Sequence, residues 1–191
     1  IPVAEEAADA GGTDPLAAIR AVNALASPEG FAADPELVVN WYNDRRRKVG
    51  RASPNPAHRA LAATPGMVHV TQNMDNLLER AGAGDVIHLH GTIDRDHCQD
   101  RCGHEEVIDP AHPPGLRHCP DCGALMRPSV VWFGEMLPQR EWFRAQASML
   151  AADVVIVVGT SGEVYPAAGL IDLAHDQGAR VIVVNPEPTP A

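Results

Sequence analysis

The apolar positions of this chain come in short unbroken runs rather than in alternation with polar ones. Three runs are rich in β-branched residues, at Val130 to Phe133, Val154 to Val158 and Val181 to Val184. Such runs are typical of strands that are covered on both faces, as in a parallel sheet. Met67 to Val70 and Val86 to Leu89 are two shorter candidates. The pattern therefore predicts a parallel sheet that is buried on both sides.

Helical patterns lie between these predicted strands. They cover Asp75 to Ala81, Gln139 to Leu150 and Pro166 to Gln177, and Gly82 and Gly178 are suited to end the first and the last of them. An alternation of strands and helices is typical of the α/β class. We therefore predict an α/β fold with a doubly wound parallel sheet.

The chain before the first predicted strand also has a helical pattern. Asp14-Pro15 and Asn55-Pro56 each place a capping side chain before a proline, which suits the first position of a helix. We therefore expect residues 15–63 to form a small helical module.

Length and charge limit the classes of function. A chain of 191 residues is long enough for one domain with a small insert and a substantial core. Its net charge of −10 argues against direct binding to nucleic acids, because neutralising phosphates requires a basic surface. No apolar run approaches the ~20 residues that are needed to cross a bilayer, so we expect no membrane partner.

All four cysteines occur as two close pairs, Cys98/Cys102 and Cys119/Cys122. Each pair can place two thiolates on one ion, and the stretch between the pairs is long enough to bring them together. Buried free cysteines and disulfides are the alternatives, but disulfides suit a small secreted domain better than a chain with its own core. We predict a structural Zn²⁺ site in a module at residues 94–127, and thiolate ligands favour a cytoplasmic location.

Polar or small residues follow three of the predicted strands. Gln72, Asn73 and Asp75 follow the first strand, Gly159-Thr160-Ser161-Gly162 follows the strand that ends at Val158, and Asn185 follows the last. Because the carboxyl ends of parallel strands meet at one edge of a sheet, these residues are expected to bind one polar ligand. For any single residue, capping of a turn or helix is the alternative.

His88 belongs to the strand predicted at Val86 to Leu89, and His90 follows two residues later, just after that strand. His90 lies at the strand end, immediately before Gly91, where a general base could reach such a ligand. His88 lies deeper in the strand, and we interpret it as structural.

The only dense basic run extends from Trp41 to Arg47. Tyr42 and Arg45 are three residues apart, so on a helix they share a face and could grip one carboxylate. A solvated basic helix end is the alternative, and the spacing alone does not decide between the two.

Taken in order, these motifs resemble the sirtuin family of NAD-dependent protein deacylases. The resemblance spans residues 26–190 and rests on several segments: Thr71 to Asp75, His88 to Gly91, the paired cysteines, Arg127 to Glu135, Gly159 to Ser161 and Val183 to Glu187. It implies one catalytic core, in which residues 64–93 and 128–191 form a Rossmann-like NAD-binding part beside the zinc-binding module and the helical module.

The resemblance also implies roles for individual residues. His90 would be the catalytic base, and the paired cysteines would bind zinc. The cofactor-binding residues would be Gln72, Asn73, Met74, Asp75, Gly159, Thr160, Ser161, Asn185, Pro186 and Glu187. The substrate-binding residues would be Tyr42, Arg45, Val131, Phe133, Gly134 and Glu135, of which the last four belong to a strand that pairs with the substrate peptide.

The reaction of this family consumes NAD and transfers the acyl group of a modified lysine to ADP-ribose, releasing nicotinamide and free lysine. The expected partner is a protein or peptide with an acylated lysine. Tyr42 and Arg45 match the pair of the subgroup that removes succinyl and malonyl groups. Two alternatives are a non-catalytic homologue that binds acyl-lysine and a zinc-ribbon nucleic-acid module, which the negative charge disfavours.

One family motif is not matched, the glycine-rich loop after the first strand. Ile1-Pro2 fits its end, but Val3-Ala4-Glu5-Glu6 follows. We expect a core that is shortened at both ends, as a piece of a longer protein or as a shortened homologue. The first is favoured, because a sheet without its first strand is hard to stabilise.

Overall fold

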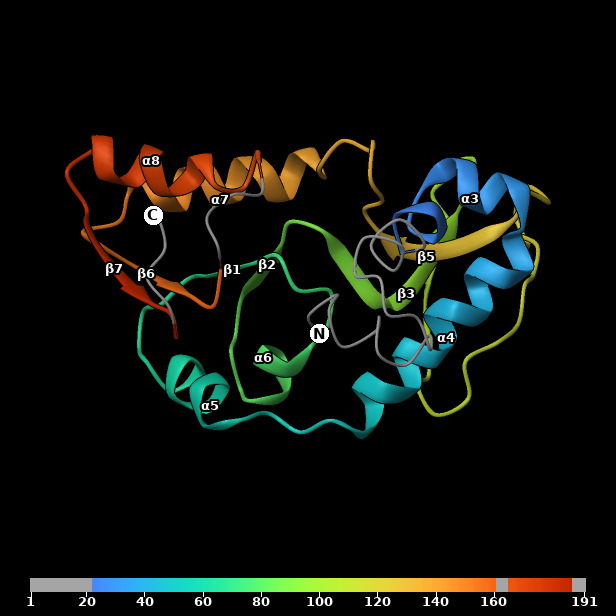
Figure 1. The fold of residues 1–191 in the computed structure, drawn as a ribbon, viewed down its shortest axis with the longest axis horizontal. Coiled ribbons are helices and arrows are strands. Elements are labelled where there is room, and N and C mark those ends of the chain that lie inside the picture. Colours follow the sequence, from blue (N-terminus) through green and yellow to red (C-terminus); the bar gives the residue numbers. More distant parts are fainter. Residues whose placement is uncertain (1–21, 161–164, 187–191) are drawn as a thin grey trace, which may run out of the picture. The chain divides into compact units, whose positions relative to one another are not determined.

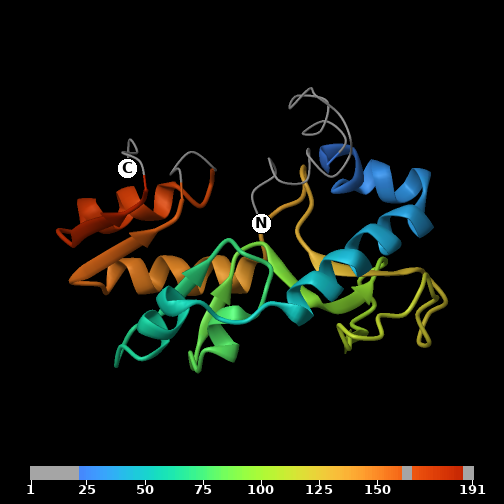
Figure 2. The same cartoon turned by 60° about the horizontal axis from the view of Figure 1, so that its bottom comes forward.

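The computed structural model describes residues 22–160 and 165–186, which form two compact units. The first unit contains residues 22–53, Met74–Asn76 and Gly91–Met136. The second contains Pro54–Asn73, Leu77–His90 and residues 137–186 (Figures 1 and 2). Each unit is therefore built from segments that lie far apart in the sequence.

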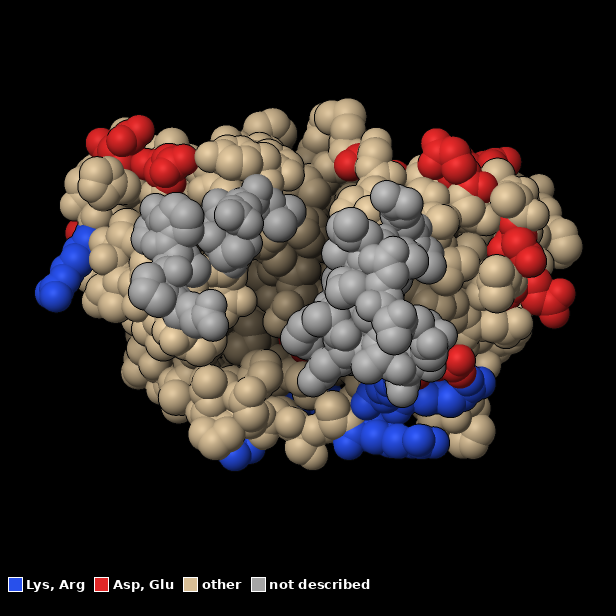
Figure 3. Space-filling model, viewed as in Figure 1, with Lys and Arg blue, Asp and Glu red and all other residues tan. Residues whose placement is uncertain are grey.

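Two capped helices stand at the beginning of the first unit. In α3 (Pro28–Ala33) and α4 (Pro35–Arg51), the preceding Ser27 and Asp34 each accept a backbone N–H of the first turn, and proline occupies the first position. Basic residues, Lys48 among them, lie in the last turn of α4, where they offset the helix dipole. Figure 3 shows Lys and Arg side chains gathered at this end of the helix. The helical pattern predicted here is confirmed, while Asp14-Pro15 lies outside the described residues.

The sheet of the first unit is antiparallel. It consists of β3 (Gly91–Cys98), β4 (Glu105–Val107) and β5 (Met126–Val130), in the order β4-β3-β5. The register of β3 with β5 shifts between Gly91 and Asp96. Gly91 has a φ of 73°, and a Cβ atom there would lie 2.1 Å from the Ser129 carbonyl oxygen, so only glycine fits.

One predicted strand is wrong. The pattern predicts a parallel strand at Val130 to Phe133, whereas β5 is antiparallel and ends at the first residue of that run. The run is apolar for another reason, because Trp132 is buried in the core and Phe133 lies exposed beside it. A buried and an exposed apolar residue thus follow each other in this loop. In the sequence they look the same as a strand that is covered on both faces.

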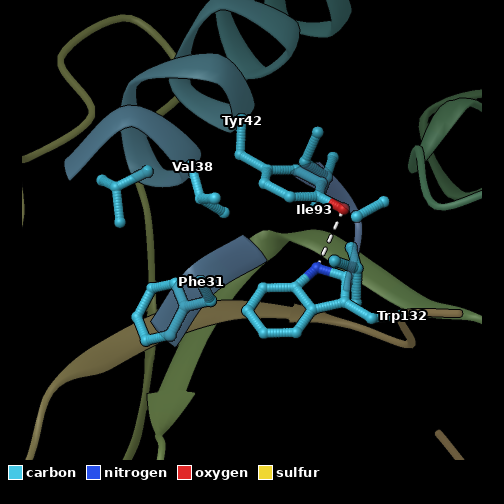
Figure 4. Packing of buried hydrophobic residues seen from close by; sticks show 8 residues of the cluster. Phe31, Val38, Tyr42, Ile93 and Trp132 are labelled. Atoms are coloured by element: carbon cyan, nitrogen blue, oxygen red, sulfur yellow. Dashed lines mark hydrogen bonds between the residues drawn. The ribbon is translucent and has the colours of Figure 1, made fainter. Parts of the chain in front are cut away.

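The core of the first unit lies between the helices and the sheet. Phe31 of α3, Val38 and Tyr42 of α4, and Ile93 of β3 surround Trp132 (Figure 4). The rings of Phe31 and Trp132 have centroids 5.3 Å apart, which is in the range for favourable aromatic pairs. Trp132 therefore fastens the loop after β5 to the helical layer.

The second unit contains two pairs of parallel strands. β1 (His69–Thr71) pairs with β2 (Val86–His88), and β6 (Val154–Val158) pairs with β7 (Arg180–Val184). Four of the five predicted strands are thus observed, and both pairs are parallel as predicted. However, the alternate residues of β6, Val154, Ile156 and Val158, are exposed, so its burial on both faces is not seen within the described part of the chain.

Four helices belong to the second unit: α5 (Pro56–Ala62), α6 (Leu77–Arg80), α7 (Gln139–Leu150) and α8 (Gly169–Asp176). α7 and α8 lie on one side of the strands, and α5 and α6 lie on the other (Figure 1). This is the doubly wound arrangement that the sequence predicts. Asn55 caps α5 as predicted, while α6 and α8 are shorter than their sequence patterns.

Within residues 22–160 and 165–186, no helix is long and apolar enough to cross a membrane.

Candidate functional site

The four cysteines converge in the first unit. Their Sγ atoms all lie within 4.8 Å of one another, with 3.4 Å between Cys98 and Cys122 and 3.5 Å between Cys102 and Cys119. A tetrahedral zinc ion with Zn–S bonds of about 2.3 Å places its sulfur ligands about 3.8 Å apart. A disulfide would instead need about 2.05 Å. The arrangement therefore fits a four-thiolate zinc site with all positions taken by protein ligands.

His104 and Asp121 stand beside the cysteine cluster. The His104 Nδ1 lies 3.0 Å from an Asp121 carboxylate oxygen, and both groups lie within 4.8 Å of the Cys119 sulfur. Such neighbours orient metal ligands and tune their basicity. This pair is not predictable from the sequence, because residues around a metal site have no fixed spacing.

The second unit contains a cavity of about 380 Å³ at the carboxyl ends of its strands. Gln72 and Asn73 line it after β1, and Gly159 and Thr160 line it after β6. Asn185, which follows β7, donates its amide N–H to the Thr160 carbonyl oxygen at 2.7 Å. The cavity therefore brings together residues that the sequence analysis assigned to one polar ligand, over a floor of apolar strand and helix residues.

His90 lies beside this group. Its Nδ1 is 3.1 Å from the Gln72 carbonyl oxygen. Because a carbonyl oxygen only accepts, Nδ1 carries the proton and Nε2 carries the lone pair. Burial lowers the pKa of His90 below 6.5, more than the hydrogen bond to Gln72 raises it. The ring is therefore neutral near physiological pH, and its basic nitrogen is Nε2.

His88 is held between two acceptors. Its Nδ1 lies 3.0 Å from the Asn73 carbonyl oxygen, and its Nε2 lies 2.7 Å from a carboxylate oxygen of Glu79. Only an imidazolium donates from both nitrogens, so an ionised Glu79 requires a charged His88. The pKa of Glu79 is lowered by its bond to His88, although partial burial raises it. This ion pair supports the Asn73 backbone at the cavity.

The remaining predicted cofactor residues are placed as follows. Met74 and Asp75 belong to the first unit, where the Met74 carbonyl accepts the Ile93 N–H at 2.8 Å. Pro186 is exposed after β7. Ser161 and Glu187 lie outside the described residues.

The four predicted peptide-binding residues lie in a loop rather than a strand. Phe133 is 60% exposed, and its N–H donates to the Ala26 carbonyl oxygen. Gly134 has a φ of 86°. Glu135 points inward, where its two carboxylate oxygens lie 2.7 and 2.9 Å from the Arg127 guanidinium. Val131 is half-buried. Arg127 was not among the predicted site residues, although it belongs to the segment Arg127 to Glu135 that resembles the family.

Tyr42 and Arg45 both lie on α4, with different surroundings. The Tyr42 hydroxyl is buried and accepts the indole N–H of Trp132 at 3.0 Å. Burial raises the pKa of Tyr42 to about 12, so the hydroxyl keeps its proton. The Arg45 guanidinium lies over the Trp41 ring, 3.1 Å from its centroid. The next residue, Arg46, is buried and bonds to Asp96, so this basic run is only partly a solvated helix end.

Comparisons of sequence place the chain among known proteins. The model of the Sir2 family matches residues 15–166. An NAD-dependent protein deacylase of Ralstonia nicotianae is 49% identical over 170 residues, which are 86% of this chain and 68% of that protein. An NAD-dependent protein deacylase of Mycobacterium tuberculosis is 47% identical over 174 residues, 87% of this chain and 73% of that protein.

Solved structures agree with this comparison. A Sir2 homologue in complex with NAD matches with a TM-score of 0.83 at 44% identity, covering 88% of this chain and 67% of that one. A Sir2 protein bound to an acetylated peptide matches with a TM-score of 0.77 at 30% identity, covering 87% and 73%. The predicted Rossmann-like α/β fold is thereby confirmed. The chain belongs to the Sir2 family.

Proposed function

We propose that this protein is an NAD-dependent protein-lysine deacylase, a transferase that moves the acyl group of a modified lysine to ADP-ribose. The observation that carries the proposal is the cavity that joins Gln72 and Asn73 to Gly159 and Thr160, with His90 held beside it. Its size and its polar rim suit part of a dinucleotide. The products are nicotinamide, O-acyl-ADP-ribose and free lysine.

Relatives support this assignment. Proteins 46–49% identical to the chain are named NAD-dependent protein deacylases, and related Sir2 structures hold NAD, ADP-ribose or an acetylated peptide. The peptide complexes also favour an acyl-lysine protein as the partner.

Residues around the cavity have separate roles in the acyl transfer. NAD would supply the electrophile, the ribose carbon that bears nicotinamide; as the acyl oxygen of the substrate bonds to this carbon, the bond to nicotinamide breaks and nicotinamide leaves. Nε2 of His90 would take the proton from a ribose hydroxyl, so that this oxygen can attack the acyl carbon, and the bond of that carbon to the lysine nitrogen then breaks with addition of water. The Gln72 carbonyl holds the tautomer that leaves Nε2 unprotonated. The ion pair of His88 with Glu79 keeps the neighbouring Asn73 backbone in place.

The zinc site serves structure rather than chemistry. Four thiolates would fill the tetrahedral positions of a zinc ion and leave none for water. The ion would join the turn after β3 to the turn at Cys119 to Cys122. Thiolates that bind zinc are reduced, which suits a reducing compartment. On this ground we propose that the protein is cytoplasmic.

We further propose that the enzyme accepts succinyl and malonyl groups through Tyr42 and Arg45. An arginine can bind the acyl carboxylate with two parallel N–H bonds, and the Tyr42 hydroxyl keeps its proton for donation. Arg45 must leave the Trp41 ring to do so, because its guanidinium lies on that ring in the structure. Substitution Arg45→Met should therefore reduce turnover of succinyl-lysine far more than that of acetyl-lysine. Equal effects on both substrates would refute the acyl preference.

The deacylase proposal is tested by measuring nicotinamide release from acetyl- and succinyl-lysine peptides with and without NAD. We expect release only when peptide and NAD are both present, and none from His90→Asn. Peptide binding without any NAD consumption would instead favour a non-catalytic acyl-lysine-binding protein.

A further inference from the structure

Arg127 and Glu135 form a buried ion pair at the loop after β5. The side chain of Arg127 is 3% exposed and that of Glu135 is 18% exposed. Two guanidinium nitrogens face two carboxylate oxygens at 2.7 and 2.9 Å, the paired geometry that makes such bonds strong. Arg127 extends from β5, so the pair ties the loop to the sheet.

The same two side chains also bind the backbone of the loop. Arg127 donates to the Val130 carbonyl oxygen at 3.0 Å, and Glu135 accepts the Trp132 N–H at 2.8 Å. The Glu135 N–H returns to the Trp132 carbonyl oxygen at 3.0 Å, and Gly134 supplies the positive φ that this tight turn needs. The ion pair therefore determines the path of residues 131–134.

The pair also determines which side chains face inward. The Arg127 guanidinium lies over the Trp132 ring, 3.2 Å from its centroid, and Trp132 is 2% exposed. Phe133 and Met136, in contrast, are 60% and 82% exposed. Moving the loop by one residue would exchange Trp132 and Phe133 between the core and the surface.

We propose that Arg127 and Glu135 are positioning residues, which hold residues 131–134 in the form that receives the acyl-lysine peptide. The inference deepens the proposed function and rests on it. It changes the role expected for Glu135, which acts through the loop instead of through contact with substrate. The structural observation behind it is that both carboxylate oxygens of Glu135 are already bonded within the chain.

Three variants separate positioning from mere stabilisation. In Glu135→Gln, an amide NH₂ replaces one of the two acceptor oxygens that Arg127 and the Trp132 N–H require. In Arg127→Lys, one ammonium cannot reproduce the fork of two parallel bonds. The double variant Arg127→Met with Glu135→Leu removes both charges. Replacing both members of a buried ion pair with apolar residues often restores the stability that is lost when only one member is removed. Asp44→Asn is the matched control, because Asp44 and Arg47 form an exposed pair on α4.

The first measurement is steady-state kinetics of each variant with peptide and NAD varied separately. We expect the KM for peptide to rise about tenfold in both single variants and in the double variant, with the KM for NAD and kcat near the wild-type values. The double variant should recover thermal stability without recovering the KM for peptide. Recovery of both together would overturn the proposal, and so would an unchanged KM for peptide in the single variants.

The second measurement does not depend on catalysis. Hydrogen exchange should accelerate at the Trp132 and Phe133 amides in Glu135→Gln, and not in Asp44→Asn. Unchanged exchange there would show that the pair does not hold the loop. If the wild-type protein releases no nicotinamide while the exchange result stands, the proposed function fails and the positioning of the loop does not.

Discussion

The indole N–H of Trp132 donates to the hydroxyl of Tyr42 at 3.0 Å, across 90 positions of sequence. Both side chains are buried, and Figure 4 shows the bond between α4 and the loop after β5. Trp132, which anchors the loop after β5 in the core, is thus bonded to the residue proposed to meet the acyl group. Substitution of either residue is therefore expected to change the position of the other side chain.

Substitution Trp132→Phe should destabilise the protein, because it removes the donor and leaves a buried hydroxyl without it. We expect a loss of about 1–3 kcal/mol in the free energy of unfolding beyond the effect of ring size. Urea unfolding of Trp132→Phe, Tyr42→Phe and the double variant measures the coupling between them. Strictly additive losses would show that the bond contributes nothing to stability.

Removal of two zinc ligands should release the metal. In the double variant Cys102→Ser with Cys122→Ser, both exposed thiols are replaced while the buried ones remain. We expect purified wild-type protein to contain one zinc ion per chain and the variant to contain none, with a lower Tm. Elemental analysis gives the metal content, and His112→Ala is a suitable control on the surface. A full complement of zinc in the cysteine variant would contradict the four-thiolate site.

His97 should make stability depend on pH. Burial, with Arg127 and Arg101 nearby, lowers the pKa of His97 from 6.5 to about 4. Between these values the unfolded chain binds the proton and the folded chain does not, so the stability present above pH 6.5 is lost as pH falls toward 4. Because the ring is partly solvated, we expect a loss on the order of 2 kcal/mol.

The measurement for His97 is urea unfolding of wild type and His97→Gln at several pH values. Loss of zinc in acid affects both proteins, so the difference between them isolates His97. The wild type should lose more stability than the variant between pH 6.5 and 4. Parallel curves for the two proteins would show that His97 is not held neutral in the fold.

The pH dependence of catalysis should reflect His90. Its pKa lies below 6.5 because of burial, so the base is already unprotonated near neutral pH. We expect kcat/KM to be flat between about pH 7 and 8.5 and to decline only in acid. His90→Asn should abolish turnover at every pH. An acidic limb centred above pH 7 would rule out the neutral, half-buried imidazole of His90 as the general base.

Much of the local structure and the cysteine ligands of the zinc site could be predicted from the sequence. The runs at Val154 to Val158 and Gln139 to Leu150 became β6 and α7 with the predicted bounds, because each pattern follows from neighbours along the chain. The cysteine spacing likewise predicted ligands that the fold brings together. Asn55 capped α5 for the same local reason.

The surroundings of each candidate residue, in contrast, depend on how the chain folds. The apolar run at Val130 to Phe133 predicted a strand, but the fold buries Trp132 and exposes Phe133. The reason is that the ion pair of Arg127 with Glu135 holds this loop. Periodicity reports which neighbours share a face, whereas a buried bond depends on partners brought together from distant parts of the chain. For that reason the contact of Trp132 with Tyr42 became visible only in the folded protein.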